Sequence, residues 1–224
     1  TSKKISNTGG RNATAYSYIE KARYAVGLYL NRHHINCVAV DLSGNVISLI
    51  RVRENFDLND DNYLRKIGET VEEVKKDTGL SDDRFLGVGI AVQGLISDDG
   101  ERVTYGLTLN FTGVTRADIA KYIPYHNRLF HDSAAAGYAE VWDRNDLDDA
   151  FYLSLSNSVG GAVIVANKIF EGERRKSGEI GHMTIIPKAG DRCYCGQRGC
   201  FDTVCRANVL AEYADGDLEK FFEL

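Results

Sequence analysis

Apolar, β-branched runs alternate with short polar turns near the start of the chain. The segments 24–30, 35–42 and 46–52 each predict a strand. Ser43-Gly44-Asn45, between the last two segments, is typical of a hairpin turn. Because the connections are too short for a crossover, the three strands are expected to be antiparallel.

A segment whose apolar residues have the spacing of a helix follows these strands. Apolar residues recur at spacings of three and four between positions 64 and 74, which predicts an amphipathic helix from Asp60 to Thr78, ended by Gly79. The segment 85–92 is almost continuously apolar, as expected of a strand in a parallel sheet covered on both faces. Strands, a helix and a further strand together predict an α/β lobe.

The second half of the chain again alternates segments that predict helices with segments that predict strands. Residues 118–123 predict a short helix that ends before Pro124, and residues 128–131 predict a strand leading into an alanine-rich helix. Residues 150–156 and 159–166 then predict a hairpin that opens a second lobe.

A cysteine-rich loop carries the most definite chemistry. Cys193, Cys195 and Cys200 form a C-x-C-x4-C knuckle with two internal glycines, and His182 lies just upstream. Thiolate and imidazole ligands in a tight loop suit tetrahedral Zn(II). The odd total of five cysteines argues against a disulfide framework, and the spacing is not that of a redox C-x-x-C pair. We expect a structural zinc site whose four protein ligands leave no open position for catalysis.

Composition narrows the function classes. The 224 residues, 43% of them hydrophobic, can form one large domain or two small lobes. A net charge of −5 gives no electrostatic footprint for nucleic acid, so these residues are not expected to hold DNA themselves. No apolar run is long enough to span a bilayer, and there is no secretory leader. A cytoplasmic protein without membrane contact is expected.

The residues Gly178-Glu179-Ile180-Gly181-His182, followed by the knuckle from Cys193 to Cys200, resemble the paired GE-x-GH and C-x-C-G-x-x-G-C signature of the ROK family of bacterial repressors, open reading frames and sugar kinases. The resemblance extends from about Tyr24 to the end of the chain. It implies an α/β, actin-like ATPase (ribonuclease H-like) fold with two lobes, and a zinc loop that forms the far wall of a sugar pocket. We expect an arm over residues 1–22, a first lobe over 23–132 and an incomplete second lobe over 133–224.

The resemblance also implies a set of sugar contacts. Asn110 and Glu179 match residues that bind sugar hydroxyls in the family, and Asp132 matches the general base of its kinases. His182 is implied both to ligate zinc and to donate to the sugar, and Asp202 stands where sugar-binding members carry glutamate. On the residues alone, Asn110 is an ordinary turn residue, and Asp132 and Asp202 are equally suited to capping the helices that follow them.

Both segments that match phosphate-binding loops of ROK kinases depart from the family pattern. In the first, residues 27–34, Tyr29 stands at the acidic position and bulky side chains replace the glycines. The second, residues 156–161, keeps only Gly160 and Gly161, and an isolated Gly-Gly pair is more often a strand irregularity than a phosphate loop. We therefore expect neither ATP binding nor catalysis.

Gly9-Gly10-Arg11-Asn12-Ala13-Thr14 resembles the segment that joins a winged helix-turn-helix to the sugar domain in ROK repressors. By composition, the first eight residues are expected to be disordered. Our leading hypothesis is a sugar-sensing effector domain of a homodimeric ROK repressor, which contacts operator DNA through a separate domain before Thr1. The alternatives are a ROK sugar kinase that uses Asp132 as base, and a zinc-stabilised scaffold that binds no sugar.

Overall fold

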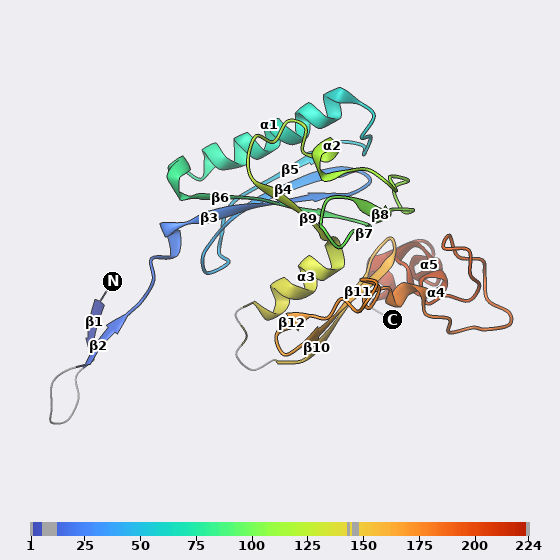
Figure 1. Ribbon diagram of the computed structural model, residues 1–224. Helices are drawn as coiled ribbons and strands as arrows, with labels where there is room; N and C mark the ends of the chain where they lie inside the picture. Colours follow the sequence, from blue (N-terminus) through green and yellow to red (C-terminus); the bar gives the residue numbers. More distant parts are fainter. Residues whose placement is uncertain (1, 6–12, 143, 145–147, 223–224) are drawn as a thin grey trace.

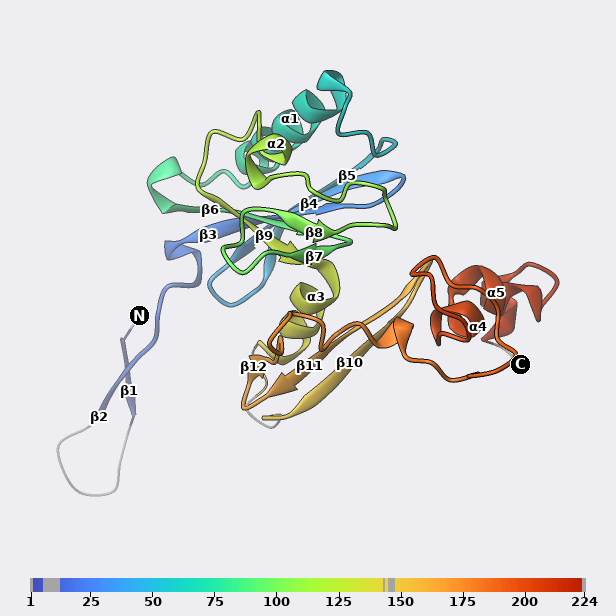
Figure 2. The same ribbon diagram turned by 45° about the vertical axis from the view of Figure 1, so that its right-hand side comes forward.

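The computed structural model describes residues 2–5, 13–142, 144 and 148–222, which form two lobes and an N-terminal hairpin that extends from the first lobe (Figures 1 and 2). The first lobe is built on a five-stranded sheet in the order β5-β4-β3-β6-β9. Its strands are β3 (Tyr24–Leu30), β4 (His34–Asp41), β5 (Val46–Arg53), β6 (Phe85–Val92) and β9 (Asn127–His131).

The pairing of these strands confirms the expected α/β arrangement. β4 lies antiparallel to both of its neighbours, β3 and β5, whereas β6 lies parallel to β3 and β9 lies parallel to β6. Alternate residues of β3 are buried, so one face of the sheet forms the core of the lobe. The carboxyl ends of β3, β6 and β9 consequently meet at one edge.

Helix α1 (Asp61–Asp77) covers that buried face (Figure 1). Ile67, Val71 and Val74 are completely buried against the sheet, as their spacing predicted. The side chain of Asp60 caps the helix by accepting a hydrogen bond from the Asn62 amide. The helix ends before Gly79, which takes a φ of 65°.

The connection from β6 to β9 contains a small hairpin, β7 (Leu95–Ile96) and β8 (Val103–Tyr105), and helix α2 (Arg116–Ile119). The prediction of a helix over 118–123 was wrong in its bounds. Thr115 forms a capping box with Asp118, so the helix begins at Arg116 and Asp118 lies inside its first turn. Two single 3-10 turns, η1 (Glu20–Ala22) and η2 (Asp82–Arg84), precede β3 and β6.

The chain passes to the second lobe through helix α3 (Asp132–Val141), which follows β9 directly. α3 packs on an antiparallel sheet of β10 (Ala150–Leu155), β11 (Val159–Val165) and β12 (Lys168–Ile169). Val141, Ala162 and Ile164 form the buried centre of this contact. The rest of the lobe is the cysteine loop with η3 (Ile180–His182), then α4 (Asp202–Cys205), α5 (Ala207–Glu212) and α6 (Leu218–Phe221).

The N-terminal segment differs from the disorder expected for the first eight residues. β1 (Ser2–Ile5) pairs with β2 (Ala13–Tyr16) in an antiparallel ribbon, which requires only backbone hydrogen bonds between neighbouring segments and no apolar core. Residues 6–12, and with them most of the segment that resembles the repressor linker, lie outside the described residues. The division into arm and lobes, and the link to a DNA-binding domain, stay predictions. Within the described ranges, no helix is long and apolar enough to cross a membrane.

Candidate ligand cleft and metal cluster

A cleft lies between the lobes, at the edge where the parallel strands of the first sheet end. Its volume is about 100 Å³, several times the roughly 10–15 Å³ that one water needs. Tyr29, Gln93 and Thr108 line it from the first lobe, and Glu179 and His182 from the second. Ligands of open α/β sheets bind at such strand ends, so the topology alone favours this position.

Asp132 stands at the junction of β9 and α3 and faces this cleft. The capping role considered for it is wrong, because α3 begins at Asp132 and the capping position belongs to His131. One carboxylate oxygen of Asp132 accepts a hydrogen bond from the Ser133 amide at 2.7 Å. Burial raises the pKa of Asp132, and the nearby His131 opposes that shift. A carboxylate held in this way is ready to accept a hydrogen bond from a ligand.

Two histidines connect Asp132 and Glu179 with the cysteine loop. Nε2 of His131 lies 3.6 Å from an oxygen of Asp132 and 3.9 Å from an oxygen of Glu179. Nε2 of His182 lies 3.8 Å from the other oxygen of Glu179. The structure therefore brings together Asp132, Glu179 and His182, three of the five residues that are expected to contact a sugar.

His182, Cys193, Cys195 and Cys200 form a cluster whose ligand atoms all lie within 4.8 Å of one another. Nδ1 of His182 is 3.6 Å from Sγ of Cys193, and the sulfurs of Cys195 and Cys200 are also 3.6 Å apart. A tetrahedron with metal–sulfur bonds of about 2.3 Å has edges of about 3.8 Å. The donor set and its spacing fit a tetrahedral metal.

The loop around the cluster depends on its glycines. Gly196 and Gly199 take φ values of 93° and 69°, which favour glycine. A Cβ atom on Gly199 would overlap the carbonyl oxygen of Ile186. Burial raises the pKa of the Cys200 thiol to about 12, so without a metal this sulfur is a neutral thiol. A metal would convert it to a thiolate.

Asn110 and Asp202 do not reach the cleft. Asn110 is exposed in a turn with a φ of 56°. Asp202 is completely buried, and it accepts a hydrogen bond from the Val159 amide at 2.8 Å. It fixes the start of β11 instead of facing a ligand. It does not cap α4 either, because Phe201 occupies the capping position and no side chain caps that helix.

Other cleft residues were not predicted from the sequence. The amide of Gln93 donates to the hydroxyl of Tyr29 at 3.2 Å, across 64 positions of sequence. Burial, and then the charge of Asp132, raises the pKa of Tyr29. Tyr194 stacks edge-on against His182, with ring centroids 5.1 Å apart. Its place between two metal-binding cysteines was the signal that could have identified it.

The glycine pair of the second loop has a packing role. A Cβ on Gly160 would overlap the Ser133 hydroxyl, and one on Gly161 would overlap the Ile180 side chain. These glycines allow β11 to approach α3 and η3 closely, which agrees with the interpretation as a strand irregularity.

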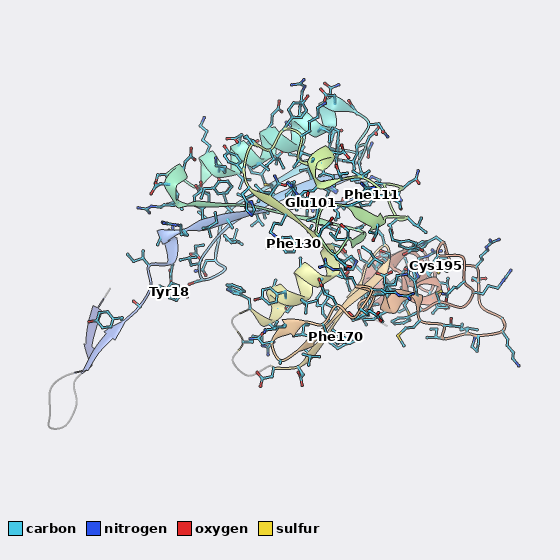
Figure 3. All side chains as sticks on the ribbon, viewed as in Figure 1. Tyr18, Glu101, Phe111, Phe130, Phe170 and Cys195 are labelled. Carbon is cyan, nitrogen blue, oxygen red and sulfur yellow. The ribbon has the colours of Figure 1, made fainter. Side chains whose placement is uncertain are left out.

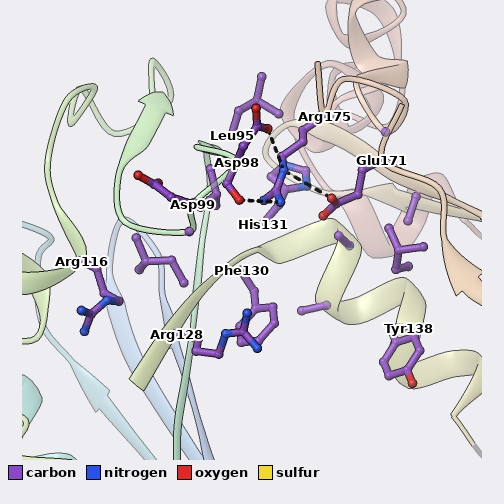
Figure 4. Close-up of a pocket in the computed structure, with 18 of the residues that line it drawn as sticks. Leu95, Asp98, Asp99, Arg116, Arg128, Phe130, His131, Tyr138, Glu171 and Arg175 are labelled. Carbon is purple, nitrogen blue, oxygen red and sulfur yellow. Dashed lines mark hydrogen bonds and ion pairs between the residues drawn. The ribbon is translucent and has the colours of Figure 1, made fainter. Parts of the chain in front are cut away.

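A second cavity of about 880 Å³ adjoins the cleft and shares His131 and Glu179 with it. In Figure 4, Arg175 points toward both Asp98 and Glu171, and Phe130 and Arg128 lie together on another wall. Arg175 lies 3.3 Å from each of the two carboxylates, so much of the charge in this cavity is already paired. Figure 3 places Phe130 on the side of its sheet nearest the second lobe, and Cys195 within that lobe. The smaller cleft, which contains Asp132 and the metal-facing histidine, is the candidate site.

The family model described as ROK family matches residues 25–221. The chain belongs to the ROK family. Its α/β fold is accordingly the two-lobed, actin-like ATPase fold, of which this chain contains a part.

Relatives include regulators and kinases. The xylose repressor of Bacillus subtilis (strain 168) is 27% identical over 210 residues, covering 91% of this chain and 53% of the repressor. A glucokinase of Halalkalibacterium halodurans is 22% identical, covering 86% of this chain and 59% of the kinase. Among solved structures, a ROK family transcriptional regulator, homolog of the E. coli MLC protein, has a TM-score of 0.71 at 22% identity, covering 87% of this chain and 49% of that one. The chain thus spans about half the length of these proteins.

Proposed function

We propose that this chain is the sugar-sensing part of a ROK transcriptional repressor and that it transfers no phosphate. The cleft supplies carboxylates at Asp132 and Glu179 and imidazole at His131 and His182, which can hydrogen-bond the hydroxyls of a sugar. The similarity to the xylose repressor supports a regulatory role.

The observation that carries this proposal is the pair of Tyr29 and Gln93. A kinase needs bare backbone amides and a metal-binding acid beside the transferred phosphate. Here the aromatic ring of Tyr29 stands at the matching position, inside the cleft and fixed by Gln93. On the opposite side, Gly160 is packed against Ser133. Side chains of the protein therefore lie beside both segments that match phosphate-binding loops, which supports a cleft that takes no nucleotide.

We further propose that the metal is Zn(II), held by His182, Cys193, Cys195 and Cys200 in a structural role. Three sulfurs and one imidazole nitrogen are a frequent ligand set for structural zinc and leave no open coordination position. Ligand binding between the lobes would change their relative orientation. In a homodimer this change would reach a DNA-binding domain carried by the longer protein.

A thermal-shift experiment tests the proposal. Neutral sugars and sugar derivatives are titrated onto the purified, metal-loaded protein, with and without ATP and Mg²⁺. One sugar is expected to stabilise the folded protein by RT ln(1 + [L]/Kd) and so to raise its melting temperature, and nucleotide is expected to add nothing. Glu179→Gln should abolish the shift, whereas Glu173→Gln, at an exposed position outside the cleft, should retain it.

A sugar kinase is the second candidate, because Asp132 retains the position of the family's catalytic base and a glucokinase is among the relatives. ATP-dependent phosphorylation of any sugar in the panel, lost in Asp132→Asn, would establish it and overturn the sensor proposal. Absence of a thermal shift with every sugar would favour the scaffold that binds none.

A further inference from the structure

We infer that the cleft selects an uncharged sugar and rejects its phosphate ester. This inference rests on the proposed sensor function and names the chemical class of its ligand. It follows from the charges that line the cleft, from the contacts of two arginines outside the lining, and from the hydroxyl groups of the lining.

The cleft has an excess of negative charge. Among the described residues that line it there is no lysine or arginine, whereas Asp132 and Glu179 contribute carboxylates. His131 lies between these two carboxylates, within 3.9 Å of both, so even a protonated His131 neutralises only one of them. A divalent metal with three thiolates beside His182 would add a further net negative charge.

Two arginines outside the cleft lining are engaged by other groups. The guanidinium of Arg32 donates to the backbone carbonyl of Thr108 at 2.7 Å and does not line the cleft. Arg206 lies 3.8 Å from the buried Asp202, which itself lies outside the cleft. A phosphate monoester carries between one and two negative charges at neutral pH and is recognised in proteins by arginine, lysine or clustered backbone amides. Among its described lining residues, the cleft offers such an ester two carboxylates and no lysine or arginine.

Neutral polar groups make up most of the remaining polar lining. Phenols come from Tyr29, Tyr105 and Tyr194, and aliphatic hydroxyls come from Ser154, Ser156 and Ser158. Each hydroxyl both donates and accepts, which matches the hydroxyl groups of a sugar. The geometry favours a neutral polyol over an anion of the same size.

Tyr29 is the residue that we assign to this discrimination. Its hydroxyl accepts the hydrogen bond from Gln93, and the charge of Asp132 acts on it directly. The phenol and Asp132 line the same cleft, so a phosphate on a ligand that Asp132 holds would have to fit beside the phenol. A neutral side chain there excludes the phosphate sterically, while the carboxylate repels it.

Paired calorimetric titrations test the inference. Glucose, N-acetylglucosamine and xylose are each compared with a monophosphate ester of the same sugar on the metal-loaded protein. For the sugar that binds, the ester is expected to bind at least tenfold more weakly, and the ratio should decrease at high salt because exposed charges are screened. Equal or tighter binding of the ester overturns the inference and leaves the sensor function intact. If neither member of any pair binds, the sensor function itself fails, and the inference fails with it.

Two variants of cleft residues test the electrostatic and the steric contribution to discrimination against the ester. Asp132→Asn removes one repulsive charge, and Tyr29→Lys replaces the phenol with a cation. Each variant should reduce the ratio of the dissociation constant of the ester to that of the sugar. Glu171→Gln is the matched control, because Glu171 lies in the adjoining cavity, paired with Arg175, and does not line the cleft. An unchanged ratio in both cleft variants, or an equal change in the control, would contradict the assignment.

Discussion

The Nε2 atom of His182 lies 3.8 Å from a carboxylate oxygen of Glu179, while Nδ1 of the same ring lies 3.6 Å from the sulfur of Cys193. One imidazole therefore joins the metal cluster to the ligand cleft. A metal-bound histidine whose second nitrogen faces a carboxylate is fixed in both orientation and tautomer. The metal should therefore control the cleft as well as the fold of the loop.

Loss of the metal is predicted to remove both stability and ligand binding. Cys195→Ser, or treatment with a strong chelator, should release the metal and lower the melting temperature markedly, because the free energy of binding a structural metal is folding free energy. Metal analysis measures the metal content of the variant, and calorimetry measures its melting temperature. Cys205→Ala is the control, because Cys205 lies outside the cluster and should keep the full metal content. A Cys195→Ser protein with normal metal and stability would contradict the assignment.

Asp132→Asn is predicted to stabilise the protein at neutral pH while it weakens the response to sugar. Burial, opposed by His131, raises the pKa of Asp132, so ionised Asp132 costs folding free energy. Below this raised pKa the folded state holds a proton that the unfolded state has released, so wild-type stability increases as the pH falls through that value. The difference in melting temperature between variant and wild type should therefore diminish on acidification. A constant difference would refute this account.

Arg175 and Asp98 connect the two lobes at the adjoining cavity. The guanidinium lies 3.3 Å from the Asp98 carboxylate, and Asp98 is 90% exposed. An exposed pair of this kind contributes at most about 1 kcal/mol, so Asp98→Asn should hardly change the free energy of unfolding. Its effect should be on the separation of the lobes, measured as an increased radius of gyration in small-angle scattering. Asp99→Asn, on the same hairpin but bonded to Ser97, should leave that radius unchanged.

Gly199→Ala should destabilise the metal loop much more than Gly113→Ala destabilises its own turn. Both glycines have positive φ values, 69° and 91°, but only at Gly199 does an added Cβ meet a backbone atom, the Ile186 carbonyl oxygen. Gly113→Ala should therefore cost only the roughly 1–2 kcal/mol of a left-handed conformation. Gly199→Ala adds the displacement of the Ile186 backbone and should also weaken metal binding. Equal losses, measured by chemical denaturation, would show that the overlap relaxes freely.

The sequence predicted those features that depend on local spacing. The cluster of His182 with three cysteines was found because the cysteines lie within eight positions, and α1 because its apolar residues follow one period. The cleft itself is formed by long-range contacts, such as the pair of Tyr29 and Gln93, which no local pattern contains. Asp202 was misplaced because a carboxylate at a helix start looks the same in sequence whether it faces a ligand or a buried backbone amide.

The direct passage from β9 into α3 has a mechanical consequence. Asp132 is the first residue of α3, so the carboxylate proposed to bind a ligand stands at the connection between the lobes. The ten residues of α3 form a rod of about 15 Å, so a rotation of about 10° at Asp132 moves its far end by about 3 Å. Small adjustments around a bound ligand would thus be amplified along the rod that supports β10 and β11.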